Sequence, residues 1–191
     1  MTIFLILAPY GAFATLMLVT SAAVTLFASA AIGMMVMAHD ALRGRSIKVL
    51  GAGSAILFAA LGAYITLVDN SLSSSAVKLM VDAGVFAISL TSLVIRQPFT
   101  LQYAREMVDA ETAQLPGFMR ASYIITWAWT GAFLLMMIAN VLMIYVPGLP
   151  LWSGLLIAFA ARNSAVYFTK WYPQHRRAKY AASANALPVI R

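Results

Sequence analysis

Long runs of apolar residues dominate the chain. Residues 3–38 contain no charged side chain. A single helix over this range would be about 54 Å long, far beyond the ~30 Å hydrocarbon core of a bilayer, so we divide the run at Thr20 and Ser21. The apolar runs are continuous rather than alternating, which favours membrane-spanning helices over a β-barrel. The expected spans cover residues 3–18, 22–38, 49–68, 76–95, 122–146 and 151–169.

The first apolar run leaves the number of spans open. Pro9 and Gly11 lie inside it, and both residues weaken or bend a helix. The run is therefore either a complete span or a kinked, partly inserted segment. We predict an all-α, polytopic bundle with five or six transmembrane spans. It forms a single domain over residues 1–169, followed by a basic tail over 170–191.

Composition supports the membrane assignment. Hydrophobic residues make up 62% of the chain and charged residues 10%, against roughly 45–50% and about 25% in soluble domains. A chain of this size cannot bury such an excess in one core. Soluble enzymes, soluble binding modules and disordered tails are therefore excluded.

Positive charge is concentrated in three segments that alternating spans would place on one side. The formal net charge is +7. By the positive-inside rule these segments and the C-terminus face the cytoplasm, where they contact anionic lipid headgroups rather than nucleic acid. The basic residues are Arg43, Arg45 and Lys48 in the first loop, Arg96, Arg105 and Arg120 in the second, and Lys170, Arg176, Arg177, Lys179 and Arg191 in the tail.

The sequence carries no motif for metal, cofactor or covalent chemistry. It has no cysteine, and its two histidines, His39 and His175, are far apart. No nucleotide-binding loop and no nucleophile–base pair is evident. We therefore expect no metal, no cofactor and no enzymatic activity, and a membrane enzyme acting on lipid headgroups is the weakest hypothesis.

A few polar residues inside spans are candidates for function. Lys78 and Asp82 are four residues apart and share a helix face. They form either an ion-responsive pair in a cavity or an interfacial ion pair in which Lys78 reaches outward. Arg162 and Asn163 either reach lipid phosphates or form an anion site. Asn140 is expected to form an interhelical hydrogen bond rather than to bind a ligand.

The loop 96–120 contains a stretch with the pattern of a short amphipathic helix. Pro98 ends the preceding span, and Phe99 and Tyr103 recur at i and i+4. This helix would lie in the membrane interface and dock on headgroups or a cytoplasmic partner, unless it is only a linker. Leu101, Ala104 and Val108 widen its apolar stripe, and Gln102, Arg105, Glu106 and Asp109 form the polar side.

Four stretches together resemble a known family. They are Arg96-Gln97-Pro98-Phe99, Tyr103-Ala104-Arg105-Glu106, Pro116-Gly117-Phe118, and a span bearing Trp127, Trp129 and Phe133 that ends in Ala139-Asn140-Val141. Over residues 76–169 the chain resembles the bacterial intracellular septation protein A family and related small inner-membrane proteins. The resemblance implies a bacterial inner-membrane location and a role in cell-envelope synthesis or septation. It also implies contacts with other membrane proteins and no enzymatic activity.

Two functional hypotheses follow from the sequence. The first is a non-enzymatic scaffold or accessory subunit that packs against other integral membrane proteins or a second copy of itself. The second is a small transporter or channel. Its path would run from Lys78 and Asp82 outside to Asn140, Arg162 and Asn163 inside.

Overall fold

The computed structural model describes residues 3–146 and 148–185, and these ranges contain helices and no strand. The all-α prediction is therefore confirmed. The helices are α1 (Ile3–Leu16), α2 (Ala22–Leu42), α3 (Val49–Leu67), α4 (Ser74–Val94), α5 (Phe99–Arg105), α6 (Ala110–Gln114), α7 (Pro116–Tyr145) and α8 (Leu151–Asn185).

Four of these helices are long and apolar enough to cross a membrane. They are α2, α3, α4 and α7. With 14 residues, α1 extends only about 21 Å, short of the ~30 Å hydrocarbon core. The apolar half of α8 carries Arg162 and Asn163, which lower its hydropathy. The fold is thus a membrane-type helical bundle, and the count of five or six spans is not confirmed.

Local signals explain where several helices begin. Ser21 caps α2, and its Oγ accepts a hydrogen bond from the Val24 amide at 3.4 Å. The expected turn at Thr20 and Ser21 therefore lies between α1 and α2. Pro116 opens α7, a position where its missing N–H costs nothing.

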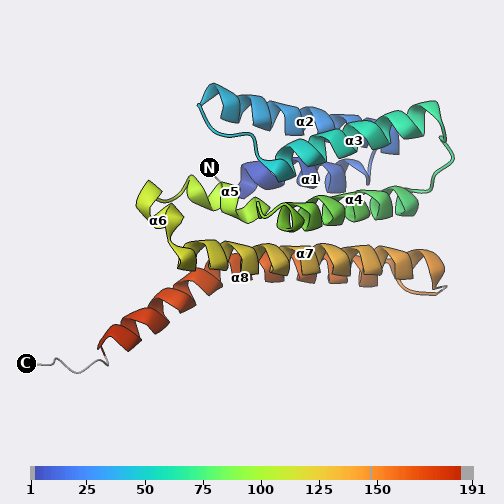
Figure 1. The fold of residues 1–191 in the computed structure, drawn as a ribbon. Helices are drawn as coiled ribbons and strands as arrows, with labels where there is room; N and C mark the ends of the chain where they lie inside the picture. Colours follow the sequence, from blue (N-terminus) through green and yellow to red (C-terminus); the bar gives the residue numbers. More distant parts are fainter. Residues whose placement is uncertain (1–2, 147, 186–191) are drawn as a thin grey trace, which may run out of the picture.

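Two helices extend beyond the residues of the expected spans. Helix α7 begins at Pro116 rather than at residue 122, because the polar residues before the apolar run are compatible with helix. Helix α8 does not end at residue 169. It continues through the expected tail to Asn185, with Pro173 inside it. Figure 1 shows the last part of α8 turning away from the bundle.

The helices run alternately up and down, so their connections fall at two opposite ends. Figure 1 shows the α2–α3 loop together with α5 and α6 at one end, and the α3–α4 and α7–α8 connections at the other. The final part of α8 also emerges at the first end. The three basic segments thus share one end of the bundle. Within it, α2 packs on α1 and α3, and α7 packs on α4 and α8.

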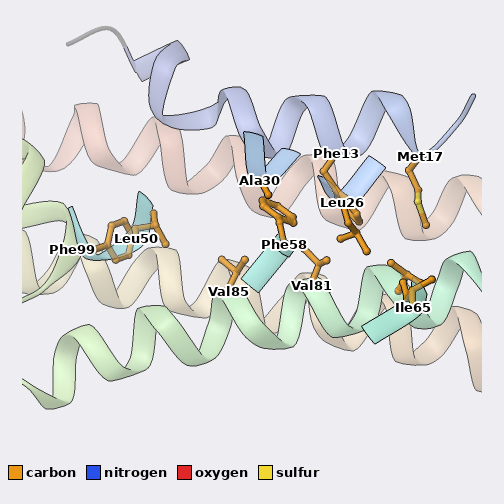
Figure 2. Packing of buried hydrophobic residues seen from close by; sticks show 11 residues of the cluster. Phe13, Met17, Leu26, Ala30, Leu50, Phe58, Ile65, Val81, Val85 and Phe99 are labelled. Atoms are coloured by element: carbon orange, nitrogen blue, oxygen red, sulfur yellow. The ribbon is translucent and has the colours of Figure 1, made fainter. Parts of the chain in front are cut away.

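The main core lies among the first four helices (Figure 2). Phe58 of α3 is fully buried at its centre, and its ring lies 5.6 Å from that of Phe13. A hydrogen bond between two hydroxyl groups connects α4 to α7: Ser89 and Thr130 lie 2.6 Å apart. Such bonds hold helices together in lipid, where apolar surface alone gives little driving force.

Candidate functional site: a cavity along the bundle

A cavity of about 630 Å³ lies between α1 on one side and α4, α7 and α8 on the other. It is lined by Ser75 and Gly154 near one end of the bundle. Near the other end it is lined by Glu106 and Thr169. Its volume falls in the range of roughly 300–1,000 Å³ that is usual for small-molecule sites. The cavity therefore follows the bundle through most of its length.

Most of the cavity wall is apolar. Phe13 of α1 faces it, as do Phe133 and Met136 of α7 and Ala158 of α8. Trp129 also lines it, and the indole Nε1 of this residue donates a hydrogen bond to Thr169 Oγ1 at 2.9 Å. The indole is therefore held in a defined orientation against the space.

Four polar residues that the sequence places inside spans line this one cavity: Lys78, Asp82, Asn140 and Arg162. Lys78 and Asp82 lie one turn apart on α4, as their spacing predicts. The Asn140 side-chain amide, from α7, donates to Asp82 Oδ2 at 2.5 Å. This is the interhelical hydrogen bond expected of Asn140.

The structure does not show the ion pair between Lys78 and Asp82. Among the described residues, the Asp82 carboxylate is hydrogen-bonded to Asn140, and the ion pairs present involve other side chains. Asp82 is turned toward α7, which directs its carboxylate across the helix interface rather than along α4. Because Asn140 contacts Asp82 directly, the two residues cannot mark opposite ends of a path.

Arg162 and Asn163 have different surroundings although they are adjacent. Within the described part of the chain, the Arg162 guanidinium makes no hydrogen bond or ion pair, and no buried side-chain nitrogen or oxygen lacks a partner. The guanidinium nitrogens are therefore accessible rather than sealed in the protein. Asn163 is exposed, does not line the cavity, and donates to the Phe159 carbonyl at 2.8 Å. Asn163 consequently does not belong to the candidate site.

At the bundle end that holds α5 and α6, an ionic cluster connects the α2–α3 loop to the residue that follows α5. Lys48 Nζ lies 2.9 Å from Asp40 Oδ2 and 2.9 Å from Glu106 Oε1. Arg45 approaches the other Asp40 oxygen at 3.4 Å. Lys48 also lies over the Tyr103 ring, 5.5 Å from its centroid. Burial raises the pKa of the Tyr103 phenol, so this group stays a neutral hydrogen-bond donor in the cavity wall.

The sequence did not single out Asp40 and Lys48 as site residues. Their opposite charges bracket a turn at Gly44, whose φ is +68°, and this was a usable signal for a local ion pair. The role of Glu106 could not be foreseen in the same way, because it reaches the cluster from a distant part of the chain.

The segment 96–120 contains a short helix where the pattern of Phe99 and Tyr103 predicts one, but its buried apolar residues pack on the bundle. It forms α5 and α6 and then the start of α7. Phe99 and Leu101 are buried against the bundle rather than facing lipid, because Pro98 turns the chain across the bundle end. The Gln102 side-chain oxygen accepts a hydrogen bond from the Val49 amide at 2.8 Å and so satisfies the start of α3. Arg96 and Arg105 are exposed.

No protein-family model matches this chain, and neither a curated protein nor a solved structure does. The resemblance to the septation protein A family therefore stays a prediction.

Proposed function

We propose that this protein is a small, non-enzymatic membrane transporter whose substrate moves through the cavity between α1 and α4, α7 and α8. The observation that carries the proposal is the extent of the cavity, whose lining residues follow the bundle through most of its length. Lys78, Asp82 and Arg162 all lie along it. Ionisable groups inside a bilayer are costly, and those that persist usually face a path or a binding site.

The proposal includes an orientation in the membrane. In addition to the four long apolar helices, α8 is the fifth span, and its Arg162 faces the cavity rather than hydrocarbon. Helix α1 enters from one end and is a short sixth element. The end that holds the α2–α3 loop, α5 and α6 faces the cytoplasm of a bacterial cell, because its basic residues resist translocation.

Reconstituted vesicles test this proposal. Chloride, inorganic phosphate and a fluorescent lysophosphatidate serve as probes. We expect at least one to cross faster than in protein-free vesicles. Losing a charge-assisted contact costs roughly 1.5–3 kcal/mol, so we expect Arg162→Gln to slow that flux about tenfold or more. Asp82→Asn should also change the rate.

The matched controls are Lys170→Gln on the exposed surface of α8 and Asp109→Asn at the start of α6. Both should leave the flux unchanged. Correctly folded protein that moves none of the three probes would contradict the transport proposal, as would equal flux in Arg162→Gln and Lys170→Gln.

A scaffold or accessory subunit is the second candidate function. The observation in its favour is the final part of α8, which leaves the bundle (Figure 1) and carries the stacked rings of Trp171 and His175, with centroids 4.8 Å apart. This segment could contact another membrane protein, and the resemblance would place that contact in cell-envelope synthesis or septation. Absence of flux, together with a stoichiometric complex that is lost when the chain is cut after Tyr172, would favour this candidate.

A further inference from the structure

We propose that the cavity binds a single-chain amphiphile with an acidic head group, such as a fatty acid or a lysophospholipid acid. This inference rests on the cavity that carries the proposed function, and it names the chemical class of ligand. Three properties of the cavity support it: its charge balance, the accessible guanidinium of Arg162, and the apolar character of its walls.

The charge balance of the cavity favours one negative charge on the ligand. Lys78 and Arg162 bring two positive charges, and Asp82 brings one negative charge. Glu106 also lines the cavity, but its carboxylate is paired with Lys48. One positive charge therefore remains uncompensated in a region of low dielectric, where an opposite charge is strongly attracted.

Arg162 provides the donors for an acidic head group. Its guanidinium has five N–H groups arranged in a plane, which match the oxygens of a carboxylate or a phosphate. Among the described residues these groups make no hydrogen bond, and they are not sealed among buried atoms. The Asn140 amide, in contrast, already donates to Asp82. The head group is therefore expected next to Arg162.

The walls of the cavity favour a hydrocarbon tail over a small hydrated anion. Phe13, Phe133, Met136 and Val166 surround the space with apolar atoms. An inorganic anion would contact Arg162 but leave these walls in contact with water. An alkyl chain would fill the space and exclude that water. An amphiphile satisfies both the cation and the apolar walls.

Trp129 allows binding to be measured directly, because it lines the cavity and is fixed by its bond to Thr169. The chain has four tryptophans. Changing Trp127, Trp152 and Trp171 to phenylalanine leaves Trp129 as the single reporter. The protein is placed in nanodiscs of phosphatidylcholine, and a brominated fatty acid or a brominated lysophosphatidate is added as quencher. The methyl ester of the same fatty acid is the neutral control.

We expect saturable quenching by one or both acids and none by the ester. If only the fatty acid quenches, the head group is a carboxylate, and if only the lysophosphatidate does, it is a phosphate. Apparent affinity should fall about tenfold or more in Arg162→Gln. It should be partly retained in Arg162→Lys and unchanged in Lys170→Gln. Helix content and melting temperature, measured by circular dichroism, verify that each variant is folded.

Two results would overturn the inference. The first is equal quenching by the ester and the acid, which indicates partitioning without recognition of the head group. The second is equal affinity of folded Arg162→Gln and Lys170→Gln. The two proposals can be contradicted separately. Amphiphile binding without flux would contradict only the proposed transport function. Flux of chloride without amphiphile binding would contradict only the proposed class of ligand.

Discussion

Lys48→Met is expected to lower the free energy of unfolding by about 3–5 kcal/mol, the range for breaking a buried ion pair from one side. The Lys48 ammonium is almost fully enclosed, with 3% of its side chain exposed, and it contacts both Asp40 and Glu106 at 2.9 Å. Methionine fills a similar volume but leaves two carboxylates without their common cation. Titration of the protein with a denaturing detergent in mixed micelles measures the loss.

Arg45→Met is the matched control for this variant. Arg45 also contacts Asp40, but at 3.4 Å and with a side chain that is 29% exposed. Exposed pairs contribute roughly 0–1 kcal/mol, so the loss should stay within this range. Adding Asp40→Leu and Glu106→Leu to Lys48→Met should recover stability, because no carboxylate is then left without the Lys48 cation, and the Arg45 side chain, which loses Asp40, is 29% exposed. A loss for Lys48→Met as small as the loss expected for Arg45→Met would show that the cluster does not hold the bundle end together.

Phe58→Ala is expected to cost about 3 kcal/mol, the low end of the range for removing a buried phenylalanine. Phe58 is fully buried, and its ring touches those of Tyr10 and Phe13 on α1. Lipid is as apolar as the core, so the loss comes from missing packing contacts rather than from contact with water. Because both rings belong to α1, the variant should also loosen that helix. Hydrogen exchange in α1 and detergent-induced unfolding measure the two effects.

Phe159→Ala provides the comparison for this second variant. Phe159 lies on α8 and is 69% exposed, so its removal should change stability by no more than about 0.5 kcal/mol. If Phe58→Ala proves as mild as Phe159→Ala, α1 is not fixed to the bundle through Phe58. The cavity wall that α1 supplies would then not be a stable part of the structure.

The sequence was informative wherever a signal is local. Ser21 marks the start of α2 because its side chain caps the helix next to it. Apolar runs predict the long helices, because the number of consecutive apolar residues shows directly whether a helix is long enough to cross a bilayer. The joint position of Lys78 and Asp82 on one face of α4 follows from their spacing in the same way.

Contacts between distant segments were not accessible to the same reasoning. Spacing indicates which face of α4 holds Asp82, but not that Asn140 of α7 will lie against it. The apolar stripe of α5 was equally compatible with lipid and with protein. Only the path of the chain after Pro98 shows that Phe99 meets the bundle. Asn163 lies outside the cavity for a related reason, because adjacent helical residues point about 100° apart.

The most direct test of the account is the sidedness of the two bundle ends. The natural chain has no cysteine, so Ser46→Cys in the α2–α3 loop and Asn70→Cys in the α3–α4 connection each introduce a single thiol at an exposed position. In intact bacterial cells, a membrane-impermeant maleimide should label the Asn70→Cys protein at once. It should label Ser46→Cys only after the membrane is opened. Labelling of both positions from the same side would contradict a bundle that spans the membrane with its basic end in the cytoplasm.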